Sequence, residues 1–167
     1  METTNHSMTR RATAHDYTRT GIYHITLHVA EGMGCPLGTV VGDAKAPDGH
    51  PDAPRVEFSP IGQMVEHELL HSITARYPMI TMDSYVIMPD HVHFCCAPAK
   101  WPIPDFHKWM KFWKAEVALS FPTEHVRPLW QRQCWDTQLR QGESFEEKCR
   151  YMVNNPVRKG LVSKAED

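Results

Sequence analysis

Several features that would assign the chain to a broad class of proteins are missing from its sequence. No apolar run approaches the roughly 20 residues needed to cross a bilayer, which argues against a helical membrane span. Residues 1–19 are polar and contain no apolar core segment, so they do not resemble a secretory signal. The five cysteines are odd in number and scattered, which excludes a disulfide framework and is typical of a reduced, cytoplasmic protein.

The sequence also lacks internal repeats, low-complexity tracts and a glycine-rich phosphate-binding loop, so P-loop nucleotide chemistry is not expected. What remains is ordinary for a globular protein: 167 residues, of which 41% are hydrophobic and 23% charged. We expect a flexible N-terminal arm at 1–19, a single domain at 20–163 and a short polar tail at 164–167.

Acidic and basic residues are divided unevenly along the chain. The net charge is −2, but residues 1–99 hold 6 Lys/Arg against 11 Asp/Glu, whereas residues 100–165 hold 12 Lys/Arg against 7 Asp/Glu. A basic half can bind a polyanion locally even on a nearly neutral protein. An uneven spread of solvated charge is the alternative interpretation.

Hydrophobic periodicity and turn residues predict an α+β domain with one mainly antiparallel sheet and helices packed on it. Ser59 is a suitable N-cap before Pro60, and Ser144 is a suitable N-cap for the last helix. The predicted elements are a strand at 21–29, a loop at 30–55 with a short strand at 39–41, a helix from 60 that ends at Pro78, paired strands at 79–88 and 91–97, a helix from 106 to about 121, a short strand within 130–139 and a helix from 145 to about 155.

The first candidate site is the triplet His91-Val92-His93 on the second strand of the predicted hairpin. Side chains two residues apart on a strand share a face, so both imidazoles project together, while Val92 and Phe94 point into the core. Two neighbouring imidazoles on a rigid strand can bind a divalent metal. A pair of surface or hydrogen-bonded histidines is the alternative.

The second candidate lies at the end of the last predicted helix. Tyr151 and Asn155 are four residues apart and therefore share a helix face, and Pro156 ends the helix there. The amide oxygen of Asn155 is a suitable third ligand for a hard cation. The alternative is a buried tyrosine followed by an asparagine cap.

The third candidate is the segment His67-Glu68-Leu69-Leu70-His71, which matches the H-E-x-x-H pattern of zinc peptidases on a predicted helix. The pattern needs a third ligand. Thr74 and Tyr77 stand where the longer metzincin pattern has glycine and histidine. A zinc peptidase that uses His67, Glu68 and His71 is therefore a remote alternative.

Taken together, the motifs resemble the single-tyrosine HUH transposases, and within them the REP-associated tyrosine transposases. Order and spacing match over about residues 10–162, and they are more specific than any single motif. The segments that carry the resemblance are the strand 85–94 (YVIMPDHVHF), the segment from Trp130-Gln131-Arg132 to Arg140, and the helix with its stop at 151–162 (YMVNNPVRKGLV).

The resemblance implies a ferredoxin-like or RRM-like HUH endonuclease core in which a sheet carries the histidines and a helix presents the tyrosine. It implies that His91, His93 and Asn155 bind Mg²⁺ or Mn²⁺ and that Tyr151 is the nucleophile. The implied substrate is single-stranded DNA with hairpins, cut through a covalent 5′-phosphotyrosine intermediate. No membrane partner is implied, and the protein is expected to be a cytoplasmic, nucleoid-associated monomer or homodimer.

The sequence departs from this family at two places. Thr137 follows Asp136 where relatives often have a histidine, and the aromatic C-terminal tail of many relatives is missing after Val162. The net charge of −2 and the missing tail leave a DNA-hairpin-binding protein of the same fold that does not cleave as the alternative function.

Basic and aromatic residues suited to DNA occur mostly in the second half of the chain. Trp101, Trp130 and Trp135 are candidates to stack on unpaired bases, whereas Trp109 lies on an apolar helical stripe and is expected in the core. The candidate phosphate contacts are Lys108, Lys111, Lys114, Arg132, Arg140, Arg158 and Lys159.

Overall fold

A computed structural model shows how these segments fold. It describes residues 21–43, 45–46, 50–72, 75, 77–78, 80–98, 106–119, 128–138 and 144–153. The predicted arm at 1–19, the predicted tail at 164–167 and the cap position Asp105 lie outside the described residues. No helix among the described residues has the length and apolarity that a membrane span requires.

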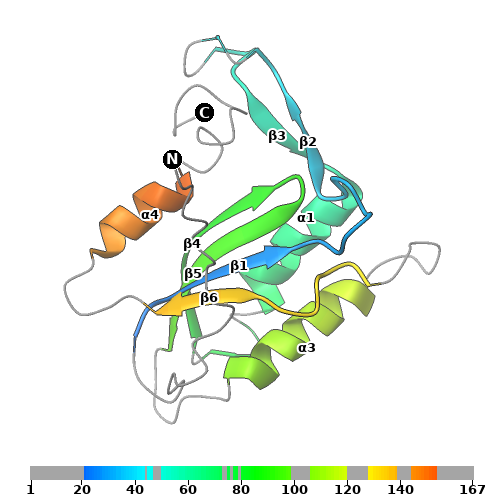
Figure 1. Cartoon of the computed structure of the whole chain (residues 1–167). Coiled ribbons are helices and arrows are strands. Elements are labelled where there is room, and N and C mark those ends of the chain that lie inside the picture. The colour runs from blue at the N-terminus through cyan, green and yellow to red at the C-terminus, as the bar shows by residue number, and fades with distance from the viewer. Residues whose placement is uncertain are drawn as a thin grey trace, which may run out of the picture.

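The centre of the fold is a four-stranded antiparallel sheet with the strand order β4-β5-β1-β6 (Figure 1). The strands are β1 (Tyr23–His28), β4 (Ile80–Met88), β5 (His91–Pro98) and β6 (Trp135–Gln138). The predicted hairpin is the β4–β5 pair, and the predicted short strand within 130–139 is β6. The α+β prediction with one main antiparallel sheet is therefore confirmed.

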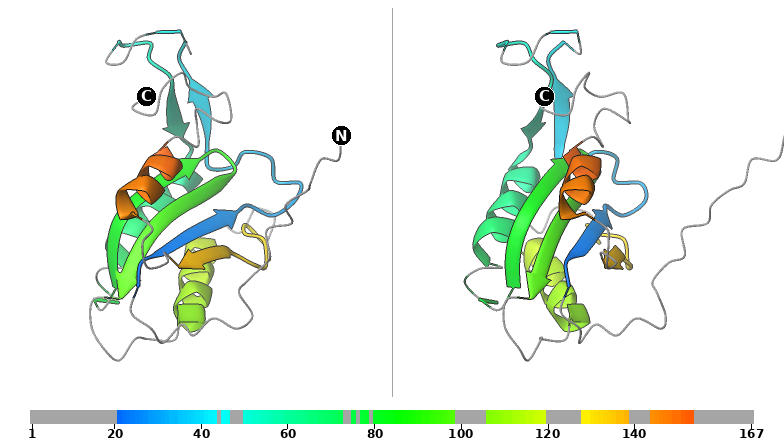
Figure 2. Two further views of the ribbon diagram at one scale, coloured as in Figure 1. Left: turned by 60° about the vertical axis from the view of Figure 1, so that its left-hand side comes forward. Right: turned by 90° about the vertical axis from the view of Figure 1, so that its left-hand side faces the viewer.

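Helices cover both faces of this sheet (Figure 2). One face carries α1 (Pro60–His67) and α3 (Phe106–Leu119), and the other carries α4 (Phe145–Val153). The main core lies on the α1 and α3 side, because alternate residues of the two central strands point that way. Its fully buried members include Ile25, Leu27, Val92, Phe94, Trp109, Trp113 and Val117.

The start of α1 follows the sequence prediction. The hydroxyl of Ser59 accepts a hydrogen bond from the Gly62 N–H (3.1 Å) and donates one to the Pro36 carbonyl (2.6 Å). The cap therefore also fastens the preceding loop to the helix. The helix predicted to run to Pro78 changes its bonding at His67, where a π-helical turn, Glu68–Ser72, follows, and Ala75 is α-helical again. The wider π-helical turn places Leu69 in the core and leaves Leu70 exposed, a detail that composition does not encode.

Close packing at Gly62 gives a stability prediction. A Cβ atom added at Gly62 would lie only 1.9 Å from the Leu37 carbonyl oxygen, a backbone atom that cannot move alone. We expect Gly62→Ala to lower the free energy of unfolding by about 1–3 kcal/mol through overpacking, measured by urea denaturation. Gln63→Ala, one residue along on the exposed side of α1, is the control and should change stability by less than about 0.5 kcal/mol.

A separate two-stranded sheet lies between β1 and α1 in the chain (Figure 1). It consists of β2 (Gly38–Val41) and β3 (Arg55–Phe58), paired antiparallel. The short strand predicted at 39–41 is confirmed, but β3 was not predicted. Its four residues alternate exposed and half-buried positions, and the pattern is too short to identify a strand.

Candidate functional site

The two faces of the main sheet differ in chemistry. The face toward α1 and α3 is apolar, whereas the opposite face carries a row of histidines from the two central strands. As predicted, His91 and His93 share a face while Val92 and Phe94 are fully buried in the core. The remaining two imidazoles of the row come from β1, at His24 and His28.

The four rings contact one another across the β1–β5 pair. His91 and His93 lie with ring centroids 4.8 Å apart and nearly perpendicular. His28 is the register partner of His91 and stacks on it at 5.0 Å, and His24 stacks on His93 at 5.3 Å. His91 and His93 are 2% and 5% exposed, so their orientation is fixed by packing.

Hydrogen bonds orient the two strand β5 imidazoles further. Nδ1 of His91 lies 2.5 Å from the Asp90 carboxylate, and Nδ1 of His93 lies 2.9 Å from the Thr26 hydroxyl. Carboxylate and hydroxyl groups placed in this way are typical second partners of metal-binding histidines. With Nδ1 engaged on both rings, Nε2 is the nitrogen that each ring would offer to a cation.

The donor set fits a divalent cation in part. His91 and His93 supply two nitrogen ligands with oriented rings. The described residues contain no group of three or more His, Cys, Asp or Glu arranged around one metal position. The predicted third ligand, Asn155, lies outside the described residues. Oxygen ligands, which Mg²⁺ and Mn²⁺ favour, would therefore have to come from that amide, from water or from a bound phosphate.

The helix that contains Tyr151 packs on the histidine face. Cys95, two residues along β5 from His93 and hence on the same face, places its thiol 3.6 Å from the Met152 sulfur. On the neighbouring strand, the Ser84 hydroxyl lies 3.4 Å from the Cys149 thiol. The backbone of Tyr151 lies in α4, next to buried Met152. Segments far apart in the chain thus bring the tyrosine helix and the histidine pair to one side of the sheet (Figure 2).

The candidate phosphate contacts that the structure describes lie on α3 and on the segment before β6. Lys108 and Lys111 are exposed on α3, which packs on the opposite face of the sheet. Lys114, also on α3, donates from Nζ to the Gln131 and Arg132 carbonyls at 2.5 and 3.3 Å, so it ties the helix to the segment before β6. The side chain of Arg132 is exposed. The other candidates, Arg140, Arg158 and Lys159, lie outside the described residues.

The tryptophans divide between core and edge. Trp109 is buried in the core, as predicted, and packs edge-on against Phe94. Trp130 is also 96% buried and packs against Trp113, so it is not an open stacking platform. Trp135 is half-buried on β6, and Trp101 lies outside the described residues.

The H-E-x-x-H segment lies on the outer side of α1 and its π-helical turn. The His67 and His71 rings are 4.6 Å apart, and the side chain of His67 is 67% exposed. No His, Cys, Asp or Glu of the described segments completes a three-ligand set with this pair. The described structure therefore supplies no closed or catalytic zinc site here.

Sequence reasoning did not identify His24, Thr26, His28 or Asp90 as parts of the site. A signal was present, because His24, Thr26 and His28 alternate in the predicted first strand with the same period of two as His91 and His93. Only the strand register shows that these two sets lie opposite each other.

Comparison with known proteins finds a match in structure but none in sequence. No family model and no curated protein matches the sequence. A solved structure of a REP-associated tyrosine transposase bound to a REP hairpin superimposes with a TM-score of 0.66. The match covers 93% of this chain and 78% of that one, with 15% sequence identity. The chain therefore has the fold of a REP-associated tyrosine transposase, as its motifs predicted.

Proposed function

We propose that the protein is a metal-dependent endonuclease and strand transferase for single-stranded DNA that carries hairpins. One observation carries the proposal: α4, which contains Tyr151, packs through Cys149 and Met152 on the sheet face that carries His91 and His93. The similar structure contains a transposase bound to a DNA hairpin, which supports the choice of substrate.

The paired histidines would hold the metal ion that contacts the phosphate. His91 and His93 would hold Mg²⁺ or Mn²⁺ through Nε2, with Asn155 as a third ligand, while Asp90 and Thr26 keep the two rings in place. A bound divalent ion supplies charge neutralisation and polarisation at a phosphodiester. Burial of both imidazoles limits their motion, so the two proposed metal ligands would be held in place before the phosphate binds.

Tyr151 would perform the covalent step. An unperturbed phenol has a pKa near 10, so passing its proton to water at pH 7 costs about 4 kcal/mol. The phenolate oxygen attacks phosphorus, the P–O bond to the 3′ oxygen breaks, and that oxygen takes a proton from water and leaves as a 3′-hydroxyl. The resulting 5′-phosphotyrosine conserves the phosphodiester bond energy, so a 3′-hydroxyl can reverse the reaction or join another strand without a nucleotide cofactor.

The polarity of the products tests this function. We would incubate a hairpin oligonucleotide with a single-stranded flank and Mn²⁺, labelled in parallel at its 3′ or its 5′ end. The 3′ label is expected in a denaturation-resistant protein adduct, and the 5′ label in a shorter free strand that ends in a 3′-hydroxyl. EDTA should abolish both products. Cleavage with the opposite polarity, or without an adduct, would refute the tyrosine mechanism.

A hairpin-binding protein without turnover is the second candidate, and one observation favours it. Thr137 pairs with His24 on the histidine side of the sheet, at a position where relatives often have another histidine. This candidate predicts tight hairpin binding with neither adduct nor cleavage in Mg²⁺ or Mn²⁺. Adduct formation in the same assay would eliminate it.

The hydrogen-bond partners of His91 and His93 give a prediction about the metal requirement of cleavage. We expect Asp90→Ala and Thr26→Val each to raise the Mn²⁺ concentration for half-maximal cleavage by about 10- to 100-fold, because each removes the hydrogen bond that orients one imidazole. Titration of the cleavage rate with Mn²⁺ measures this effect.

Thr81→Val is the matched control for Thr26→Val. The Thr81 hydroxyl also makes a hydrogen bond on the sheet, to the Ala97 carbonyl at 3.1 Å, but it does not contact a histidine. Its metal requirement should stay at the wild-type value. An equal shift in Thr26→Val and Thr81→Val would show that general loosening of the sheet, and not ring orientation, is responsible.

A further inference from the structure

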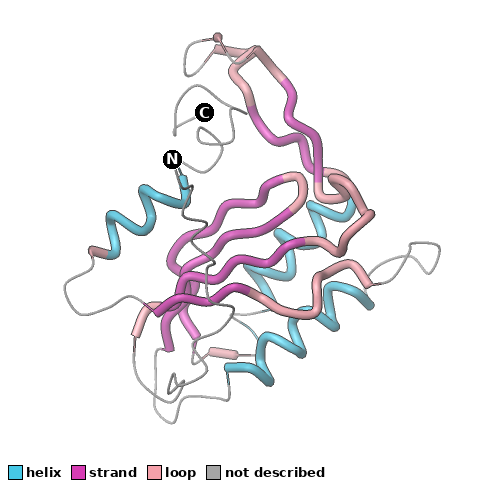
Figure 3. The backbone as a smooth tube through the Cα atoms, viewed as in Figure 1, coloured by secondary structure: helices cyan, strands magenta, loops and turns pink. Residues whose placement is uncertain are grey.

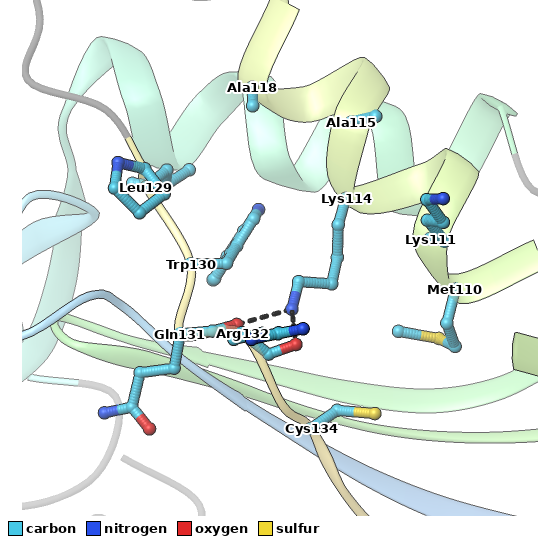
Figure 4. A pocket seen from close by; sticks show the side chains of 11 residues that line it. Met110, Lys111, Lys114, Ala115, Ala118, Leu129, Trp130, Gln131, Arg132 and Cys134 are labelled. Atoms are coloured by element: carbon cyan, nitrogen blue, oxygen red, sulfur yellow. Dashed lines mark hydrogen bonds between the residues drawn. The ribbon is translucent and has the colours of Figure 1, made fainter.

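A cavity away from the histidine row lies between α3 and the loop that precedes β6. The loop runs beside α3 (Figure 3), and the cavity between them has a volume of about 490 Å³ (Figure 4). This size is in the range of small-molecule binding pockets. Lys114 bridges the two walls through its bonds to the Gln131 and Arg132 carbonyls, so the cavity has a fixed width.

The lining combines an apolar interior with a basic rim. Met110, Ala118 and Trp130 supply apolar surface, and Lys111 and Arg132, which also line the cavity, are exposed. Neither of these two cations forms an ion pair with a carboxylate in the described part of the chain. A ligand with one flat apolar part and one anionic part matches this division.

A buried donor inside the cavity points to a ligand atom as well. The indole N–H of Trp130 belongs to a side chain that is 96% buried, and it has no hydrogen-bond partner among the described residues. Figure 4 shows the nitrogen end of this ring turned toward α3, on the side where the cavity lies. A buried donor without an acceptor is unfavourable, and a ligand oxygen or ring nitrogen placed there would satisfy it.

A second cavity adjoins the first. It measures about 410 Å³, shares Trp130, Gln131 and Arg132 with the first, and extends to Trp135. Trp135 is the register partner of Thr26, whose hydroxyl bonds His93. The second cavity therefore extends from the first to Trp135, whose partner Thr26 lies on the histidine face of the sheet.

We propose that the α3 cavity binds one unpaired nucleotide of the single-stranded flank of the DNA substrate, with its base inside and its phosphate at Lys111 and Arg132. The inference rests on the proposed function, since it assumes that DNA occupies the histidine face. A nucleobase is flat, offers acceptors to the Trp130 N–H and carries an adjacent anion. A strand that continues past Trp135 would run toward Thr26 and His93.

Photo-crosslinking locates the flank directly in the full-length protein. A hairpin oligonucleotide would carry one 5-iododeoxyuridine at each flank position in turn, and crosslinked peptides would be identified by mass spectrometry. One position, or two adjacent ones, should crosslink within residues 110–118 or 128–135. Flank crosslinks found only elsewhere would overturn the cavity assignment.

Affinity measurements supply the energetic test. An abasic site at the crosslinking position should weaken binding of the flanked hairpin about tenfold, the size expected for one base contact, and this change leaves the protein itself unaltered. Arg132→Glu should weaken it similarly, with no effect on a hairpin that has no flank. Lys45→Glu changes the net charge equally but lies in the β2–β3 loop, and it is expected to bind like wild type.

The outcomes separate the two proposals. Hairpin binding and adduct formation that are insensitive to the abasic site and to Arg132→Glu would overturn the cavity proposal and leave the proposed function standing. Failure to bind any hairpin, flanked or not, would overturn both.

Discussion

Replacing Tyr151 with phenylalanine is expected to abolish the covalent protein–DNA adduct and to lower cleavage by about 10⁴-fold or more, as loss of a nucleophile does in other covalent enzymes. Hairpin affinity should remain within about twofold of wild type, because only the phenol oxygen is removed. The measurement is the fraction of 3′-labelled strand that stays with the protein on a denaturing gel in Mn²⁺.

Tyr85 offers a matched control for this substitution. Its hydroxyl lies on the core side of the sheet and donates to the Glu66 carboxylate at 3.1 Å. Burial, with the hydrogen bond and the negative charge of Glu66, raises the pKa of the Tyr85 phenol, so it stays protonated at neutral pH and is a poor nucleophile. Tyr85→Phe should form the adduct at the wild-type rate and lose about 1 kcal/mol of stability. An adduct that survives Tyr151→Phe but not Tyr85→Phe would identify Tyr85, on the core side of the sheet, as the nucleophile and would refute the assignment to Tyr151.

Local sequence signals predicted most of the fold because the features they encode are local. Ser59 before Pro60 caps α1, and the Ser144 hydroxyl accepts from the Glu147 N–H at 3.4 Å at the start of α4. The apolar, β-branched run before the Pro89-Asp90 turn and the extended run after it predicted the β4–β5 hairpin for the same reason. The β3 strand and the π-helical turn after His67 depend on their neighbours: one pairs with β2 and the other keeps Leu69 in the core.

The candidate site was only half predictable, and the missing half depends on long-range contacts. The period of two that places His91 and His93 on one face is visible in three residues of sequence. The contacts of His28 with His91 and of Thr26 with His93 follow from strand register, which joins residues more than 60 positions apart. Helical spacing likewise could not show that Lys114 bonds the Gln131 carbonyl, or that α3 lies on the face opposite the histidines.

The histidine row gives the second large expected effect. We expect His93→Gln to lower cleavage at saturating Mn²⁺ by about 10³-fold, because it removes one of two proposed protein nitrogens from an ion that contributes several kcal/mol to the transition state. Glutamine keeps a polar side chain at this buried position, which limits the structural damage. Direct Mn²⁺ binding by isothermal titration calorimetry should weaken in parallel, while hairpin affinity in EDTA should not change.

His24→Gln separates metal binding from stacking. His24 is similarly buried and stacks on His93 at 5.3 Å, yet it belongs to β1 and is not a proposed ligand. Its cleavage rate should fall less than tenfold and its Mn²⁺ affinity should be unchanged. If both variants lost cleavage and Mn²⁺ binding equally, the four rings would act as one structural stack. Equal losses would mean that His93 and His24 both contribute packing and that His93 does not coordinate the cation. The Mn²⁺ site would then have to lie elsewhere.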